Sequence, residues 1–418
     1  MTDASGTEMG SEEEATMKND PGRVRVSGPL SAYRDGFAEE LAGQGYTPGS
    51  AQRQVGLLAH LSRWLDSRGL GAADLTPECV EGFLGARRAE GYTIELSQRG
   101  VLPLLVYLRA LGVAPVPPAP LPCTPAEMLL RQYGHYLAAE RGLAAVSIEG
   151  YLSTARLFLS ERERPGGLDL AGLTARDVTA FVVGQCRGRR AGSAKTLVTA
   201  LRSLLRFLFL QGCTPCPLAQ AVPAATGWAD QRLPRPLGAA AVPALLASCD
   251  RHTLAGARDF AILTVLRRLG LRAGEVAALQ LGDIDWRHGE IAVRGKGGRR
   301  ERLPLPADVG EAVVAYLRWR PRVRCRALFL RVRAPIAGLT SDGVQDVVRG
   351  SCMRAGLPVA GAHRLRHHAA TAMLAGGASL AEVGQVLRHA RPATTSLYAK
   401  VDRVALRRLA RPWPGGAR

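Results

Sequence analysis

The sequence predicts a mainly α-helical protein in which two small all-helical modules precede a larger domain of helices with a small antiparallel sheet. Three observations support this class. Apolar residues recur every three or four positions over most of the 418 residues, as in helices that face a core. Two proline-rich stretches, 113–125 and 213–237, divide the chain into three parts. The segment 291–306 instead has short apolar runs around a glycine cluster, which is typical of a hairpin.

The N-terminal half of the chain holds the two predicted modules. Residues 1–27 are polar and acidic without an apolar core, so we expect a disordered tail rather than a signal peptide or a folded unit. Residues 28–120 then form the first helical module and residues 124–220 the second. The last helix of each is strongly apolar and spans 97–112 in the first module and 193–212 in the second.

The two modules resemble each other in sequence, which predicts a common plan. The matched residues are Leu75-Thr76, Val80 and Phe83 with Leu173-Thr174, Val178 and Phe181, and Tyr107-Leu108 and Gly112 with Phe207-Leu208 and Gly212. Thr76 and Thr174 stand where the N-cap of a helix would stand. Chance similarity between two amphipathic segments is the alternative to a repeated module.

Residues 235–418 form the third predicted part. Apolar periodicity predicts a series of helices there, over 239–250, 257–270, 308–320, 341–356, 364–377, 379–390 and 394–410. The hairpin at 291–306 would place Lys296 at its tip. We therefore expect a mainly helical domain with a small sheet.

The charge of the chain points to a polyanionic partner. The formal net charge is +19, and from Arg235 to the end 31 lysines and arginines stand against 13 acidic residues, so we expect the third part to bind the anion. No stretch approaches the ~18 apolar residues of a membrane span, so we expect no membrane association and a cytoplasmic location. The eight cysteines are scattered, which indicates reduced thiols.

Five basic residues and one tyrosine follow each other in a fixed order in the third part. They are Arg272 in LGLRAGEVAAL, Lys296 in RGKGG, His363 and Arg366 in HRLRH, His389 in LRHA, and Tyr398 in TTSLYAKV. Their order, spacing and surroundings resemble the tyrosine recombinases, the phage integrase family. The resemblance covers roughly 125–405. It implies that 124–220 is a core-binding domain and 235–418 the catalytic domain, and residues 28–120 resemble an additional SAM-like DNA-binding module.

The chemistry of phosphodiester cleavage explains why such residues are needed. In-line attack builds negative charge on the phosphate oxygens, and the departing alkoxide needs a proton. Arg272 and Arg366 offer planar, permanently charged forks that bind phosphate oxygens. The resemblance implies that His389 donates a further hydrogen bond to the phosphate and that Lys296 is the general acid. It also implies that His363 assists proton transfer or orients the site.

The resemblance further implies that Tyr398 is the nucleophile, with Glu275 and His367 as supporting residues. Because an unperturbed tyrosine has a pKa of about 10, nearby cations must stabilise its phenolate. The implied function is that of a site-specific recombinase or integrase that cleaves and rejoins DNA through a 3′-phosphotyrosyl intermediate. No metal, ATP or other cofactor is expected. The implied partners are double-stranded DNA and three further copies of the chain in a tetramer on DNA, alone or with sister recombinases.

Each of these residues also has a plainer interpretation. Arg272 could form an ordinary i,i+3 ion pair with Glu275 on a helix surface. Lys296 could simply be solvated in its glycine-rich hairpin. His389 could be a structural histidine, and Tyr398 could pack as a core aromatic residue.

The segment HRLRHH, residues 363–368, admits a metal-binding alternative. His363 and His367 lie four residues apart, which would place both on one face of a helix, as zinc ligands require. Arg364 stands where a zinc protease motif has its glutamate, and Arg366 would lie beside the cation, so we expect no metal here.

Two residues depart from the pattern of the family. Arg388 stands directly before His389, where a glycine is usual, and His368 stands where a small hydroxyl residue is usual. Both departures concern the fine geometry of the site, and Arg388 could add a phosphate contact. Two other functions remain open: a catalytically silent DNA-binding accessory protein, and DNA relaxation like that of a type IB topoisomerase.

Overall fold

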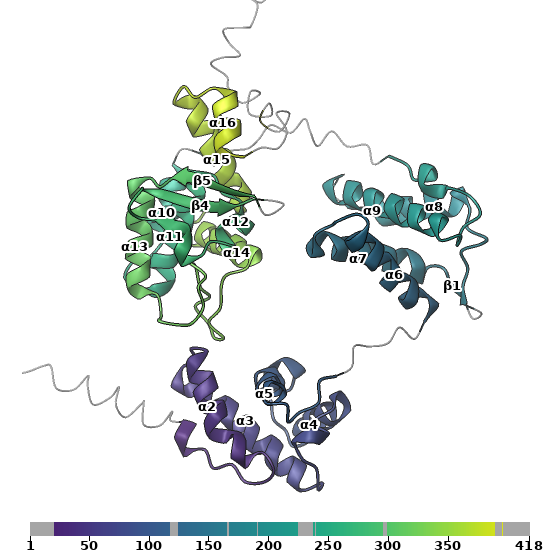
Figure 1. The fold of residues 1–418 in the computed structure, drawn as a ribbon, viewed down its shortest axis with the longest axis vertical. Helices are drawn as coiled ribbons and strands as arrows, with labels where there is room; N and C mark the ends of the chain where they lie inside the picture. Colours follow the sequence, from purple (N-terminus) through teal and green to yellow (C-terminus); the bar gives the residue numbers. More distant parts are fainter. Residues whose placement is uncertain are drawn as a thin grey trace, which may run out of the picture. The chain divides into compact units, whose positions relative to one another are not determined.

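A computed structural model describes residues 21–117, 124–164, 167–189, 191–224, 237–238, 240–295, 299–388 and 395 (Figure 1). The tip of the hairpin, most of the predicted tail and all of the last predicted helix except residue 395 lie outside these residues. The described residues are mainly helical, with one two-stranded and one three-stranded antiparallel sheet, which confirms the predicted class. None of the described helices is long and apolar enough to cross a membrane.

By its internal contacts the chain divides into two units, Pro118–Arg232 and the remainder. Each of the three sequence-predicted parts has a hydrophobic core among its own residues. The first part contains the helices α2 (Arg34–Gly43), α3 (Pro48–Asp66), α4 (Pro77–Ala89) and α5 (Gln98–Ala110). Pro48 and Pro77 occupy first-turn positions, where the missing N–H costs nothing.

The second part repeats this order with α6 (Pro125–Ala139), α7 (Ala145–Ser160), α8 (Ala175–Cys186) and α9 (Ala191–Leu210). The strands β1 (Glu163–Arg164) and β2 (Gly167–Leu168) pair between α7 and α8. The repeat predicted from the sequence is visible in detail. Thr76 and Thr174 are the N-caps of α4 and α8 and accept hydrogen bonds from Cys79 N at 3.3 Å and Asp177 N at 3.4 Å.

The ends of α5 and α9 match as well. Gly112 has φ 72° and Gly212 has φ 68°, the left-handed conformation that glycine adopts after a helix. Val113 N donates to Leu108 O at 3.1 Å, and Cys213 N donates to Leu208 O at 2.9 Å. The two helices therefore end in the same hydrogen-bonded turn.

The third part surrounds a buried helix. It contains α10 (Ala241–Ala247), α11 (Leu254–Leu269), α12 (Ala273–Ala277), α13 (Ala307–Trp319), α14 (Ser341–Arg354), α15 (Ala362–Ala375) and α16 (Leu380–Val386). The helix α11 is buried on most of its surface because α13, α14 and α15 all pack against it. These helices agree with the predicted ones, except that the short α12 was not predicted.

The predicted hairpin is present as β4 (Glu290–Arg294) and β5 (Arg300–Pro304), with Arg294 opposite Arg300. A short strand that was not predicted, β3 (Ile284–Asp285), pairs with the other edge of β4. Gly295 N donates to Arg299 O at 2.8 Å at the neck of the hairpin. Lys296 lies outside the described residues, beyond this neck.

Candidate active site

The site begins at the turn that follows α11. Gly270 has φ 58°, a conformation that favours glycine, and a Cβ atom there would lie 2.6 Å from Leu387 Cδ2 and displace the end of that side chain. Leu271 is fully buried and Arg272 is the N-cap of α12. This turn places Arg272 close to the start of α15 and the end of α16.

Glu275 holds Arg272 from the first turn of α12. Its carboxylate, only 6% exposed, accepts hydrogen bonds from Arg272 N at 2.8 Å and Arg272 Nη1 at 2.7 Å. Glu275 anchors the Arg272 guanidinium through Nη1. The Arg272 side chain is nevertheless 46% exposed, so the guanidinium remains open to solvent. The i,i+3 pair considered from the sequence therefore exists, with a buried carboxylate rather than on a helix surface.

Glu275 also binds Arg388, which directly follows Leu387 after α16. Arg388 Nη2 lies 2.6 Å from Glu275 Oε2, and both side chains are at most 6% exposed. Arg388 has φ 55°, a left-handed conformation that glycine adopts at no steric cost. This explains why a glycine is suited to the position. The Arg388 side chain points into the protein toward Glu275, so the phosphate contact considered from the sequence is not its observed contact.

The helix α15 carries three of the predicted residues. Gln345 Oε1 on α14 accepts a hydrogen bond from Ala362 N at 2.8 Å and thus caps the first turn of α15. The rings of His363 and His367, one turn apart, pack edge to face with 4.2 Å between their centroids. Both histidines therefore lie on one face of α15, as their spacing predicted.

Arg366 lies beneath the surface and is only 2% exposed. Its Nη1 donates to Gly270 O at 2.5 Å, and its Nη2 donates to Leu387 O. Arg366 thereby joins the turn after α11 to the end of α16. The sequence indicated a phosphate-binding arginine here but not these two backbone contacts.

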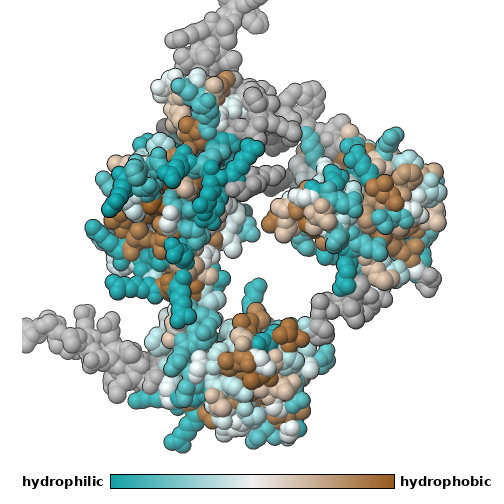
Figure 2. Space-filling view, in the orientation of Figure 1, coloured by the Kyte–Doolittle hydropathy of each residue, from teal (hydrophilic) through white to brown (hydrophobic). Residues whose placement is uncertain are grey.

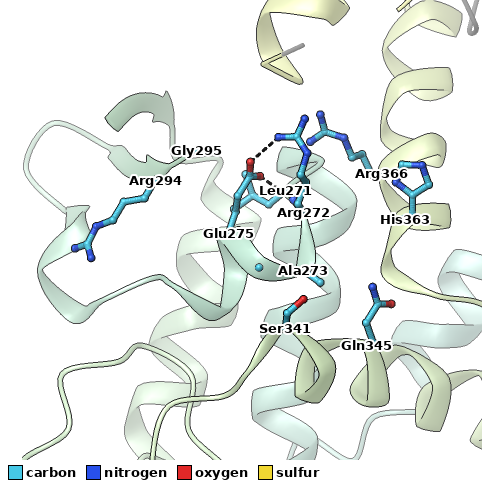
Figure 3. A pocket seen from close by; sticks show the side chains of 11 residues that line it. Leu271, Arg272, Ala273, Glu275, Arg294, Gly295, Ser341, Gln345, His363 and Arg366 are labelled. Atoms are coloured by element: carbon cyan, nitrogen blue, oxygen red, sulfur yellow. Dashed lines mark hydrogen bonds and ion pairs between the residues drawn. The ribbon is translucent and has the colours of Figure 1, made fainter. Parts of the chain in front are cut away.

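A cleft of about 460 Å³ collects these groups. It is lined by Leu271, Arg272, Ala273, Gly274, Glu275, Arg294, Gly295, Ser341, Gln345, His363 and Arg366. Figure 3 shows the side chains of Arg272 and Arg366 turned to the same region, with His363 beside Arg366, whereas the side chain of Arg294 points away from them. Three arginines against one glutamate give the lining a positive formal charge, which suits an anion.

The electrostatics of the cleft act on His363. The pKa of its ring is lowered from the ordinary value because the ring is partly desolvated, and the positive charges of Arg366 and Arg272 lower it further. The side chain nevertheless keeps contact with solvent. A bound anion would oppose the effect of the two arginines.

The structure thus brings together four predicted residues, Arg272, Glu275, His363 and Arg366, with His367 packed on His363 from the next turn. Three predicted residues, Lys296, His389 and Tyr398, lie outside the described residues. Among the described residues, no group of three or more histidine, cysteine, aspartate or glutamate side chains is arranged to hold a metal ion.

Two residues of the site were missed from the sequence. Gln345 lies in an ordinary amphipathic helix, and only the fold shows that it caps α15. Arg294 was not separated from the other hairpin arginines, although its Nη2 binds the buried Asp283 at 3.2 Å and so fixes the base of the hairpin. No local motif marks either residue.

Comparisons with known proteins agree with the resemblance found in the sequence. Residues 236–404 match the model of the phage integrase family, and residues 130–212 match the phage integrase N-terminal SAM-like domain. A Sinorhizobium fredii protein named as an integrase/recombinase, y4rA, is 42% identical over 402 residues, which cover 93% of this chain and 96% of that protein. The tyrosine recombinase XerD of Listeria monocytogenes is 31% identical over 290 residues, 67% of this chain and 96% of XerD.

One solved structure shows the shared fold. It is a lambda integrase tetramer bound to a Holliday junction, with a TM-score of 0.52 and 17% identity over 73% of this chain and 88% of that chain.

Proposed function

The chain belongs to the phage integrase family of tyrosine recombinases, and on this basis we propose that it is a site-specific recombinase that cleaves and rejoins DNA through Tyr398. The observation that carries the proposal is the basic cleft, in which Arg272, His363 and Arg366 come together from α12 and α15. We extend this set to Lys296 and His389 on the strength of the family motif.

In the proposed reaction the Tyr398 hydroxyl attacks a backbone phosphorus and displaces the 5′ oxygen of the next nucleotide. The new bond is a 3′-phosphotyrosyl ester. The proton of the Tyr398 hydroxyl passes to His363, and Lys296 supplies the proton that the departing oxygen takes up; both transfers reverse when the strand is rejoined. A 5′ hydroxyl of the partner strand then attacks the same phosphorus and releases the tyrosine. The number of phosphoester bonds is unchanged, so the cycle consumes no ATP.

The arginines in the cleft would stabilise the charge that develops in this reaction. The Arg272 guanidinium is anchored to Glu275 and remains open to solvent, so it could contact a phosphate. Arg366 is fixed by two backbone carbonyls, so it has little freedom to move as charge develops. His363 would reach the same phosphate from the first turn of α15, and His367 would orient its ring.

DNA binding by several parts of the chain follows from the same proposal. We propose the domain limits 28–120, 124–220 and 235–418, each with its own hydrophobic core. Residues 124–220 carry twelve basic against seven acidic residues, which supports contact with the DNA backbone.

We also propose a tetramer on two DNA duplexes, by analogy with the lambda integrase tetramer on a Holliday junction. Such a protein would act on DNA in the cytoplasm.

A trapping experiment tests the proposed nucleophile. A nicked random-sequence duplex library loses a short fragment on cleavage, so the covalent protein–DNA adduct accumulates. Adducts isolated under denaturing conditions and sequenced would reveal the DNA site. The Tyr398→Phe variant should form no adduct, and an adduct in that variant would disprove the assignment of Tyr398.

The alternative functions predict different results. A catalytically silent accessory protein would bind the library without forming an adduct. A topoisomerase-like enzyme would relax a supercoiled plasmid that carries the site and yield no joined products. We place the accessory protein second because the set of six candidate residues is complete in the sequence, and the topoisomerase-like enzyme second because two helical modules of similar plan precede the catalytic part.

A further inference from the structure

The first and second helical modules share a framework but differ in the outer surface of their last helix. With Gly112 matched to Gly212, the buried residues Leu104, Leu105 and Leu108 of α5 correspond to Leu204, Leu205 and Leu208 of α9, and all six are at most 5% exposed. The two helices thus turn equivalent faces to their cores. The outward positions can therefore be compared one by one.

Two outward arginines of α9 are replaced by apolar residues in α5. Arg202 and Arg206 line a hollow of about 440 Å³ on the second module. Their counterparts Leu102 and Val106 lie one turn apart on the same face of α5 and are 47% and 52% exposed. Ala110, a further turn along this face, is also exposed. We call Leu102, Val106 and Ala110 the α5 face, and Figure 2 shows hydrophobic surface over this part of the module.

The first module is also less positively charged than the second. Residues 28–120 carry eight basic and nine acidic residues, against twelve and seven in residues 124–220. A module with no net positive charge and an apolar outer helix is poorly suited to follow the DNA backbone, whose binding depends on cations. This argues against the expectation that the first module is a second copy of the DNA-binding surface.

We infer that the α5 face docks against the α5 face of a second copy of this chain when both copies are bound to DNA. This inference rests on the proposed function, which places several copies on DNA. The first module carries almost no net charge, so two copies of it can approach each other without strong repulsion. A two-fold contact needs a self-complementary surface, and an apolar face of residues one turn apart meets this condition.

The size of the α5 face explains why DNA is needed for the contact. Two half-exposed side chains and an alanine offer on the order of 200 Å², far below the roughly 800 Å² per partner of a stable interface. DNA would bring two copies to an effective concentration in the millimolar range, at which a weak apolar contact suffices. The contact should therefore appear as cooperative DNA binding rather than as a dimer in free solution.

The relatives are consistent with a separate role for the first module. The S. fredii protein aligns with 93% of this chain, whereas the alignment with L. monocytogenes XerD covers 67% of this chain and 96% of XerD. XerD is therefore too short to contain a counterpart of all three parts. The first module lies outside the residues that the two family models match, 130–212 and 236–404.

Cooperative binding of the full chain to random-sequence duplex DNA tests the inference. A short duplex that holds one copy reports intrinsic affinity, and a long duplex that holds several copies reports cooperativity, both by fluorescence anisotropy. The double variant Leu102→Gln/Val106→Gln should lower the cooperativity about tenfold and change the affinity for the short duplex less than twofold. Polar residues at these positions are compatible with the fold, because α9 has arginines there.

The control is Val146→Gln/Val183→Gln, which changes two exposed apolar residues of the second module and should change neither quantity. Unchanged cooperativity in the Leu102/Val106 variant would overturn the inference. An equal loss of affinity on both duplexes would also overturn it, because the α5 face would then contact DNA or another part of the same chain. If the unmodified chain bound neither duplex, the proposed function itself would fail.

Discussion

Arg388 and Glu275 form a buried ion pair, 2.6 Å between Nη2 and Oε2, that connects the end of α16 to the first turn of α12. Because Glu275 also binds Arg272, one carboxylate links a proposed phosphate-binding arginine to the residue before His389. Arg388 thus takes a conformation that suits glycine and gains an ion pair that glycine cannot make. In this structure the departure from the family pattern has a structural effect, because it connects the end of α16 to α12.

Two substitutions of Arg388 separate the contribution of its ion pair from the cost of its left-handed backbone conformation. Arg388→Met loses the ion pair and keeps a side chain at φ 55°, whereas Arg388→Gly loses the ion pair and removes the conformational cost. We expect both variants to be less stable than the parent, by about 1–3 kcal/mol for methionine, because Glu275 loses one partner but keeps Arg272. The glycine variant should be about 1 kcal/mol more stable than the methionine variant. Urea unfolding of the full chain measures the free energy of unfolding of each variant. Equal values for the two variants would show that the left-handed conformation carries no cost.

Features that depend on local sequence could be predicted, whereas contacts between residues far apart in the chain could not. Apolar periodicity and N-cap residues are local signals, so the helices, the hairpin and the repeat could be predicted. The pairing of Arg388 with Glu275, 113 residues away, depends on the turn at Gly270 and the packing of α16, which no local pattern encodes. The same holds for the carbonyl contacts of Arg366, which bring together residues from three elements.

The stability of the third part should depend on pH through His363. Its pKa is lowered in the folded protein, so the unfolded chain binds a proton more readily between the folded pKa and the ordinary value of about 6.5. The contribution of the neutral ring is therefore complete above pH 6.5 and is lost as the pH falls through this window. Thermal unfolding between pH 5 and 8 should show a weaker pH dependence in His363→Gln. An equal pH dependence in the parent and in His363→Gln would contradict this account.

The hollow on α9 should contribute to DNA binding. Arg202 Nη2 donates to Val222 O at 2.9 Å, which fixes the side chain beside Arg206 in a hollow without an acidic lining residue. The variant Arg202→Leu/Arg206→Val introduces the residues that α5 carries, so the fold should persist. If both arginines contact phosphates, the slope of log affinity against log salt should fall by about 2. The charge-matched variant Arg156→Leu/Arg176→Val, at exposed positions on α7 and α8, should change the slope less. Equal slopes in the two variants would contradict a specific role for the hollow.

The residue at position 345 should influence the site through its hydrogen bond to α15 and, when it is replaced by glutamate, through its charge. Its Oε1 accepts from Ala362 N at 2.8 Å and caps the helix that carries His363 and Arg366. Gln345→Ala should cost about 1 kcal/mol of stability, because a donor at the start of α15 loses its partner. Gln345→Glu keeps an acceptor at the N-terminus of α15, where negative charge is favourable, so its stability should equal or exceed that of the parent. The same carboxylate lines the cleft and would repel a phosphate, so DNA affinity and adduct formation should both fall. A glutamate variant with normal adduct formation would show that the phosphate does not approach α14.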